Sequence, residues 1–288
     1  MRRWLILMCA LAFLSIGNLP SALADPPALE VVFNFESINQ GGIGVVRVSA
    51  PGLEGARARF LNRLIDFYAR DDAQYGLLAT SMEQPPGAYP LEIMAWFEDN
   101  SRQTWEGQVT ITDGGFIRQD VTIPGELGYL LDPEIDRAER TRLMGLFGQV
   151  TPEHYWDGPF IPPTAGEFTS PFGAWRLYNE SLWARHTGLD IRGPVGTALV
   201  ASGAGRVVLA EWLDVRGNAV YIDHGLGVYT GYAHLTEIHV TRGQIVRQGQ
   251  IIGVSGNTGR SSGPHIHWEV AVAGEWVNPA QFLEVTLP

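Results

Sequence analysis

The sequence predicts a mainly β protein in which two β-rich parts are joined by a short helical and proline-rich connection. Three observations lead to this fold class. The 288 residues include 34 glycines and 18 prolines beside 45% hydrophobic residues, a balance typical of turn-rich β proteins. Short apolar runs are repeatedly bounded by glycine, asparagine and aspartate, which favour turns. One stretch in the middle of the chain has helical spacing, and the length is typical of two domains.

The first 24 residues predict a cleaved secretory signal. Arg2 and Arg3 precede an apolar run over residues 4–16, and the sequence ALA at 22–24 fits a small-residue cleavage site. An N-terminal membrane anchor is the alternative, but the run is shorter than the ~20 apolar residues that a span needs. We therefore expect an extracytoplasmic protein, in the periplasm or the cell envelope, with no stable membrane insertion after cleavage.

The charged residues exclude one class of partner. All 20 basic residues are arginines, the formal net charge is −11, and no basic face is visible in the sequence. A nucleic-acid-binding protein needs such a face to neutralise phosphates, so we expect no nucleic-acid partner. The single cysteine, Cys9, lies in the predicted signal, so the mature protein has no disulfide and no cysteine nucleophile.

Residues 25–125 predict a small antiparallel β-sandwich. Apolar runs at 31–35, 89–97 and 107–112 alternate with turn residues at the spacing that such sandwiches show. The stretch 56–70 fits either two alternating strands or one amphipathic helix, and we favour strands.

Residues 126–163 predict a helical and proline-rich linker. Asp132 can cap a helix and Pro133 suits its first turn, while Gly148 and Pro152 end it. The proline-rich run at 158–163 predicts an extended segment, and the domain boundary is placed there. An apolar face of the helix follows from the spacing of Ile135, Ala138, Leu143, Leu146 and Phe147.

Residues 164–288 predict a second β domain, and three of its fragments contain residues suited to metal binding and proton transfer. They are HTGLD at 186–190, YAHL at 232–235 and GRSSGPHIHWE at 259–269. His265 and His267 are two apart and therefore point to the same face of a strand, while Ile266 and Trp268 face a core. His186 and Asp190 would be about 13 Å apart if extended, so the segment must bend at Gly188 for both to reach one zinc ion.

Two histidines and one carboxylate suit a zinc ion with one open position, and two further histidines suit proton transfer. Spacing alone allows either His265 or His267 as the ligand. The alternative is that all these histidines are hydrogen-bonded residues of a β core. His154, His224 and His239 have no ligand-type spacing, and we expect them to be ordinary polar residues.

The segment from about 168 to 283 resembles the lysostaphin-type, LytM-like zinc endopeptidases that cleave peptidoglycan. The matching fragments occur in the family's order and cover about 115 residues. Besides the three already described they are TSPFG at 169–173, PVGT at 194–197, GRVV at 205–208, GNTG at 256–259 and VNP at 277–279. The resemblance implies an antiparallel β-sheet peptidase domain of the duplicated hybrid motif type. The N-terminal part resembles, more diffusely, immunoglobulin-like domains.

Carried over by position, the resemblance implies that His186, Asp190 and His267 bind one Zn²⁺ per chain and that His234 and His265 are catalytic. It implies a secreted metalloendopeptidase that uses a zinc-activated water to hydrolyse stem or cross-bridge peptides of peptidoglycan. The alternative is a catalytically silent module of the same fold that binds the cell wall and activates other wall hydrolases. The bond cleaved, the oligomeric state and the role of the N-terminal domain remain open.

Two further residues are assigned roles near this site. Tyr178 is a candidate for the tyrosine that the family often places near its cleft. Glu269 follows His267 by two residues and shares its strand face, and we favour a structural role over one in orienting a ligand.

Overall fold

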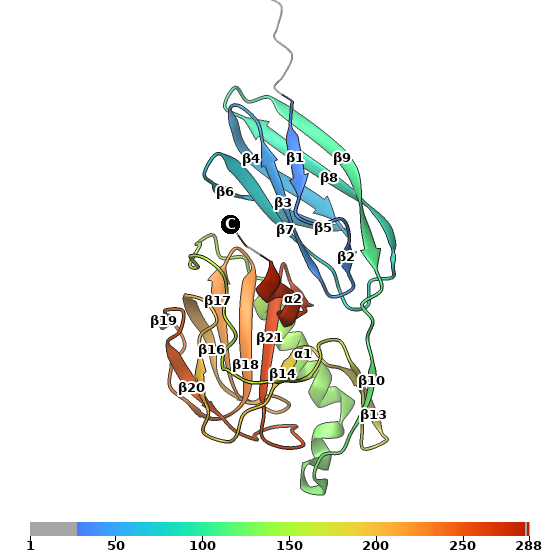
Figure 1. Ribbon diagram of the computed structural model, residues 1–288, viewed down its shortest axis with the longest axis vertical. Coiled ribbons are helices and arrows are strands. Elements are labelled where there is room, and N and C mark those ends of the chain that lie inside the picture. The colour runs from blue at the N-terminus through green and yellow to red at the C-terminus, as the bar shows by residue number, and fades with distance from the viewer. Residues whose placement is uncertain (1–27, 286, 288) are drawn as a thin grey trace, which may run out of the picture.

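Two β-rich parts lie one above the other in the computed structural model, and helix α1 (Pro133–Phe147) lies beside the lower part (Figure 1). The structure describes residues 28–285 and 287. The predicted signal, residues 1–24, lies outside the described residues. None of the helices in the described part of the chain is long and apolar enough to cross a membrane. The predicted mainly β fold class is confirmed.

The N-terminal part is a sandwich of two sheets. One sheet has the order β1 (Glu30–Phe33), β3 (Ile43–Ser49), β7 (Ala73–Ala79), β6 (Tyr68–Arg70). The other has the order β2 (Ile38–Asn39), β9 (Arg102–Thr112), β8 (Gly87–Phe97), β4 (Leu53–Phe60), β5 (Arg63–Asp66). The ambiguous stretch 56–70 therefore forms strands, as favoured over a helix.

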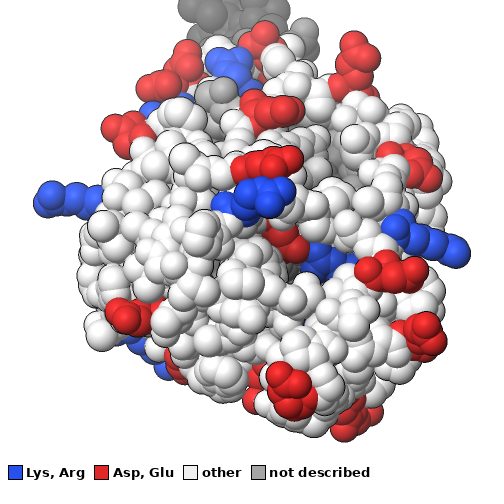
Figure 2. Space-filling model, turned by 60° about the horizontal axis from the view of Figure 1, so that its bottom comes forward, with Lys and Arg blue, Asp and Glu red and all other residues white. Residues whose placement is uncertain are grey.

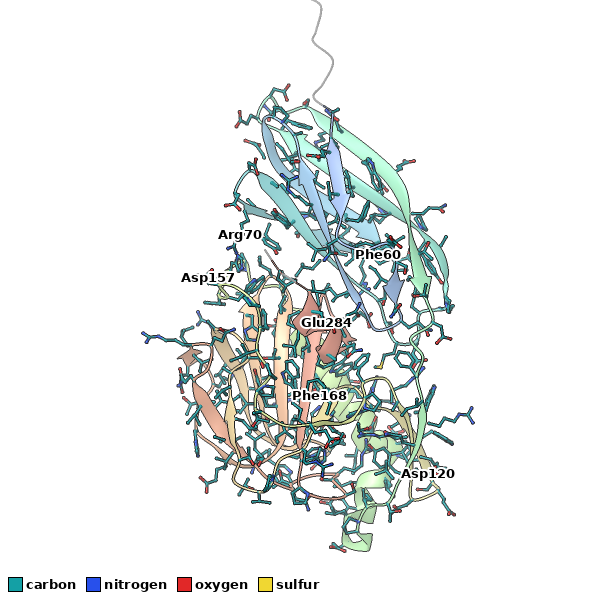
Figure 3. The ribbon with its side chains drawn as sticks, viewed as in Figure 1. Phe60, Arg70, Asp120, Asp157, Phe168 and Glu284 are labelled. Carbon is teal, nitrogen blue, oxygen red and sulfur yellow. The ribbon has the colours of Figure 1, made fainter. Side chains whose placement is uncertain are left out.

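Apolar side chains from both sheets meet inside the sandwich. Val46 and Leu78 of the first sheet and Phe60 and Ile93 of the second belong to one fully buried cluster. Figure 3 labels Phe60 in this part of the molecule. Alternate residues of each strand reach this core, as the period of a half-buried strand requires. The immunoglobulin-like character of the sandwich stays a prediction.

The chain leaves the sandwich through β10 (Arg118–Val121), followed by the 3-10 helix η1 (Gly125–Leu131) and α1. Strand β10 pairs in parallel with β12 (Trp175–Tyr178), which pairs antiparallel with β13 (Leu182–Arg185). The Asp132 carboxylate accepts a hydrogen bond from the Glu134 N–H at 2.9 Å, and Pro133 opens the helix. The predicted helix and its N-cap are confirmed.

The buried face of α1 differs from the predicted one. Leu143 and Phe147 are buried against aromatic residues of the C-terminal part, but Ala138 is exposed and Glu139 is only 6% exposed. The predicted face was wrong at Ala138, and it did not include Glu139, which is buried. Apolar spacing alone does not reveal that a buried arginine, Arg216, faces Glu139.

The C-terminal part is built on one large antiparallel sheet. Its main path runs β11 (Phe168–Ser170), β14 (Leu189–Ile191), β21 (Ile266–Val272), β18 (Val228–Ile238), β17 (Gly217–Gly225), β16 (Gly205–Leu213), β19 (Ile245–Val246). Off this path are β15 (Ala198–Val200), β20 (Ile251–Ser255) and β22 (Glu275–Val277), and helix α2 (Pro279–Glu284) follows. Tyr232 and Trp268 are fully buried in its core.

The proline-rich segment before this sheet is packed against it. Trp156 and Phe160 belong to the main buried cluster of the C-terminal part. The Tyr155 N–H donates to the His224 carbonyl at 3.1 Å, and the Ile161 N–H donates to the Ser202 carbonyl at 3.0 Å. The segment predicted as a linker is therefore attached to the C-terminal sheet, while the domain boundaries themselves stay a prediction.

Arg63 of β5 connects the two parts. Its guanidinium donates to the Ala273 carbonyl at 3.0 Å and to the Ala79 carbonyl at 2.7 Å, and it pairs with Glu275 at 3.3 Å. Arg70 and Asp157 also lie at this junction (Figure 3), with their charged atoms 3.9 Å apart. The sandwich is thus held directly against the C-terminal sheet.

Candidate active site

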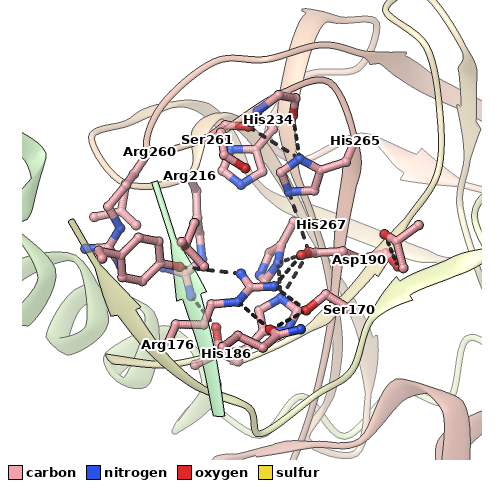
Figure 4. A pocket seen from close by; sticks show the side chains of 18 of the residues that line it. Ser170, Arg176, His186, Asp190, Arg216, His234, Arg260, Ser261, His265 and His267 are labelled. Atoms are coloured by element: carbon pink, nitrogen blue, oxygen red, sulfur yellow. Dashed lines mark hydrogen bonds and ion pairs between the residues drawn. The ribbon is translucent and has the colours of Figure 1, made fainter. Parts of the chain in front are cut away.

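Neighbouring strands of the C-terminal sheet bring the five predicted site residues together (Figure 4). Asp190 on β14 lies opposite His267 on β21, and Ala233 on β18 lies opposite His267 on its other side. His234 follows Ala233, and His265 lies just before β21. His186 lies just before β14. The three motifs therefore converge because β14, β21 and β18 are adjacent in the sheet.

His186, Asp190 and His267 form a tight cluster. His186 Nε2, Asp190 Oδ1 and His267 Nδ1 are 3.0 Å from one another. The side chains are nearly buried, with 2%, 6% and 6% exposure. Ile266 and Trp268 are fully buried on the opposite face of β21, as the strand period predicts.

Hydrogen bonds away from the cluster fix which nitrogen of each ring faces it. His186 Nδ1 bonds the Pro171 carbonyl at 2.7 Å, which places the proton there and leaves Nε2 as a lone-pair donor. His267 Nε2 bonds Glu269 Oε1 at 3.1 Å, which leaves Nδ1 facing the cluster. Burial lowers the pKa of His186 to about 4, so this ring is neutral at pH 7.

Arg176 of β12 holds the second oxygen of Asp190. Its guanidinium contacts Asp190 Oδ2 at 2.5 Å and Ser170 Oγ at 2.7 Å. Burial by itself would raise the pKa of Asp190, but the neighbouring His186 and Arg176 hold it well below the usual range. Asp190 is therefore ionised and offers Oδ1 to the cluster.

His234 and His265 lie beside the cluster. His234 Nδ1 bonds the Thr258 carbonyl at 2.7 Å, and His265 Nδ1 bonds the Gly263 carbonyl at 2.7 Å. His265 Nε2 lies 3.6 Å from Asp190 Oδ1. The ring centroids of His234 and His265 are 4.8 Å apart, and burial lowers the pKa of His234 well below its usual value.

His234 has a left-handed backbone conformation, with φ of +61°. Such a conformation is unfavourable for a residue with a side chain and persists only where surrounding contacts impose it. Here the His234 N–H donates to the Arg216 carbonyl at 2.8 Å.

Gly188 has a different role from the predicted one. Its φ is not in the left-handed region, so the bend between His186 and Asp190 does not depend on glycine's freedom. A Cβ at this position would lie 2.5 Å from the Trp268 carbonyl oxygen and 2.7 Å from His267 Cε1. Gly188 is therefore required because the His267 ring packs directly on its backbone.

The cluster fits a zinc ion by the chemistry of its donors. Two imidazole lone pairs and one carboxylate oxygen converge, and all three atoms lie within 4.8 Å of one another. Catalytic zinc sites use this donor set and keep a fourth position open. His265 Nδ1 and His267 Nε2 are both directed to other partners, and it is His267, through Nδ1, that completes the set.

A cavity of about 680 Å³ is lined by all five residues. Tyr178 lines it too, with its ring under the Arg260 guanidinium, 4.6 Å from that carbon to the ring centroid. Viewed from below (Figure 2), charged side chains of both signs lie close together near the centre of that face. Arg176, Arg260 and Asp136 are among the charged residues of the cavity wall.

Sequence reasoning missed two arginines of this site and described the role of Glu269 only in part. Glu269 contacts His267 directly, so the structural role favoured for it is incomplete. Arg176 and Arg216 were not identified, because isolated arginines carry no spacing signal. The position of Glu269 on the same strand face as His267 was the one available signal.

Residues 184–279 match the family model described as Peptidase family M23. This segment is therefore similar to the catalytic domains of that peptidase family. Its strands β14, β18 and β21 supply Asp190, His234 and His267. The M23 match begins well after helix α1, which lies outside the matched residues.

Two curated relatives are similar to the part of the chain that contains the matched residues 184–279. Peptidoglycan DD-endopeptidase ShyA of Vibrio cholerae is 48% identical over 95 residues, which is 33% of this chain and 22% of the relative. DD-carboxypeptidase/endopeptidase Mpg of Neisseria meningitidis is 43% identical over 121 residues, 42% of this chain and 27% of the relative. The chain thus spans about a quarter of the length of each.

One solved structure resembles nearly the whole chain. A crystal structure described as a putative peptidase M23 from Pseudomonas aeruginosa has a TM-score of 0.64 at 24% identity. The match covers 87% of this chain and 95% of the other. At this identity the likeness concerns the fold, and its coverage extends beyond the matched residues 184–279.

Proposed function

We propose that this protein is a secreted, zinc-dependent metalloendopeptidase that hydrolyses peptide cross-links of bacterial peptidoglycan. The observation that carries the proposal is the convergence of His186, Asp190 and His267 at 3.0 Å separations, each with its other polar atom bonded to the protein. The M23 match and the names of the relatives support the substrate class. The presence of the full donor set weighs against the catalytically silent alternative.

His186 through Nε2, Asp190 through Oδ1 and His267 through Nδ1 would hold one zinc ion. When bound, zinc supplies the Lewis acidity that activates water and polarises a peptide carbonyl at neutral pH. Arg176 holds Asp190 ionised and keeps one of its oxygens away from the cluster. The Pro171 carbonyl and Glu269 keep the two histidine rings oriented.

His234 and His265 would transfer protons and bind the developing charge on the substrate. Each ring is fixed through Nδ1 to a backbone carbonyl, so Nε2 is the atom available to accept or donate a proton. Burial keeps His234 neutral, as a proton acceptor requires. Both rings line the same cavity of about 680 Å³ as the three cluster residues, so a substrate bound there would lie beside them.

The domain organisation is part of the proposal. Residues 25–125 are proposed as an immunoglobulin-like domain, residues 126–163 as the connection and residues 164–288 as the peptidase domain. A signal over residues 1–24 would direct the protein to the periplasm or cell envelope.

Zinc content and release of fragments from purified peptidoglycan test the function. We expect about one zinc ion per chain and new amine ends, both lost in Asp190→Ala. His234→Ala and His265→Ala should keep zinc and lose activity by about 100-fold or more, the usual size of a general acid–base contribution. A His265→Ala protein without zinc would show that the roles are assigned wrongly. A wild-type protein without zinc would favour the regulatory module.

A further inference from the structure

We infer that Glu139 of helix α1 is a positioning residue for His267, acting through Arg216 and Glu269. The inference rests on the proposed function, since it concerns a proposed zinc ligand, and it adds a residue that lies outside the M23 match at 184–279. All four side chains are nearly buried, with exposures of 6%, 5%, 1% and 6% along the path from Glu139 to His267.

The first link joins His267 to Glu269. The Glu269 carboxylate accepts the Nε2–H of His267 at 3.1 Å, so the proton stays on the nitrogen that faces away from the cluster. Thr187 and Tyr221 also donate their hydroxyl groups to this carboxylate. The orientation of the His267 ring therefore depends on where Glu269 is held.

The second link joins Glu269 to Arg216 through two parallel contacts. Arg216 Nη2 lies 2.5 Å from Oε1 and Nε lies 3.1 Å from Oε2. Two parallel contacts fix both the distance and the plane of the carboxylate.

The third link joins Arg216 to α1. Glu139 Oε1 accepts from Arg216 Nη1 at 2.7 Å, and its Oε2 accepts from the Val215 N–H at 2.7 Å. Glu139 therefore fixes the Arg216 side chain and the backbone beside it. The Arg216 carbonyl in turn accepts the His234 N–H, so the same loop also positions a proposed catalytic histidine.

Attachment of the helix does not by itself require Glu139. Leu143 and Phe147 bury the apolar side of α1, and Asp136 pairs with Arg260 at 2.7 Å. Glu139 is nevertheless buried and is directed at the guanidinium that holds Glu269. A role in docking alone would not explain why its contacts continue without a break to a ring of the cluster.

The experiment compares Glu139→Gln with Glu134→Gln in the full-length protein. Glu134 lies on the exposed face of the same helix and pairs with Arg137. Zinc affinity is measured on metal-free protein by competition with a chromophoric chelator. Partners that orient metal-binding histidines typically change affinity by about 10- to 100-fold, so we expect roughly 10-fold weaker binding for Glu139→Gln and no change for Glu134→Gln.

A second measurement needs neither zinc nor substrate. Nitrogen-15 NMR of the metal-free protein reads which His267 nitrogen carries the proton and how strongly Nε2–H is bonded. We expect Glu139→Gln to shift this signal and Glu134→Gln to leave it unchanged. In the double variant Glu139→Gln with Glu269→Gln, zinc affinity should fall no further than in Glu269→Gln alone, because the path runs through Glu269.

The outcomes separate this inference from the proposed function. If Glu139→Gln lowers only the free energy of unfolding, with the zinc affinity and the His267 signal unchanged, Glu139 is a structural residue and the inference is wrong. If both readouts change as expected while wild-type protein cuts no peptidoglycan, the inference stands and the proposed function fails. If the wild-type protein cleaves peptidoglycan but the zinc affinity and the His267 signal are unchanged in Glu139→Gln, the proposed function stands and the inference is wrong.

Discussion

Gly188 is surrounded so closely that even one added methyl group has no room. In Gly188→Ala the new Cβ would meet the Trp268 carbonyl oxygen and the His267 ring. We expect a loss of about 1–3 kcal/mol in the free energy of unfolding, as overpacking usually produces, together with lower zinc affinity. Urea denaturation and chelator competition measure the two effects.

A matched glycine gives the control for this variant. Gly145 lies within α1 and a Cβ there would meet no atom within 4 Å. Gly145→Ala should therefore stabilise the protein, by about 0.5–1 kcal/mol, because alanine favours a helix. Equal destabilisation by both substitutions would contradict the proposed close packing at Gly188.

His224 gives the protein a defined response to acid. The ring is buried, with Nδ1 bonded to the Ala204 carbonyl and Nε2 to Thr230, and burial lowers its pKa to about 4 from an ordinary value of 6.5. Between pH 6.5 and 4 the unfolded chain takes up a proton that the folded chain excludes. The free energy of unfolding should therefore decrease as the pH is lowered from 6.5 to 4, by up to about 3 kcal/mol from this ring.

The His224→Gln variant isolates this contribution. It should be less stable than wild type at pH 7. The difference between the two proteins in the free energy of unfolding should become smaller as the pH is lowered toward 4. Denaturation curves at several pH values in this window provide the measurement. If the difference in the free energy of unfolding does not change with pH, His224 does not titrate as inferred.

At the scale of elements, helix α1 is a structural part of the C-terminal unit. Leu143 is fully buried and packs in the cluster that contains Phe147, Tyr221 and Trp276. Leu143→Ala should lower the free energy of unfolding by about 2–5 kcal/mol, the usual effect of removing a buried leucine side chain. Arg137→Ala on the exposed face should change it by less than about 0.5 kcal/mol. Similar small effects would show that the helix is only loosely attached.

The elements also show how far the sequence alone can lead. Alternation and turn residues predict the strands, and Asp132 with Pro133 predicts the start of α1, because these signals are local. The histidine motifs and their family resemblance lead to the five site residues. Arg176, Arg216 and Glu139 could not be found in this way. Their contacts join segments far apart in the chain, and no local pattern encodes which buried charges will meet.

At the scale of the whole molecule, Arg63 determines how firmly the sandwich is held on the C-terminal sheet. Arg63→Met removes contacts to the Ala79 and Ala273 carbonyls and to Glu275. We expect a loss of about 1–3 kcal/mol, because two partly buried carbonyls lose a charged donor. Calorimetry should show one unfolding transition for the wild-type protein and two for Arg63→Met, because the two parts then unfold separately.

Arg59→Met serves as the control for this substitution. Arg59 pairs with Glu92 on the exposed surface of the same sheet, with 60% and 37% of the two side chains exposed. Exposed pairs of this kind contribute little, so the change should stay below about 1 kcal/mol. An equal loss in both variants would mean that Arg63 does not couple the two parts.

The parallel pairing of β10 with β12 joins a segment near residue 120 to one that is synthesised more than 50 residues later. The sandwich draws its strands from residues 30–112 alone, so it can fold as soon as that part of the chain exists. The pair of β10 and β12 forms only when β12 has been synthesised. The histidine cluster also needs β21, which lies near the end of the chain. Contacts between distant segments also form slowly. A nascent chain that stops short of β21 would carry a complete sandwich and no histidine cluster, so the proposed active site is the last part to be completed during synthesis.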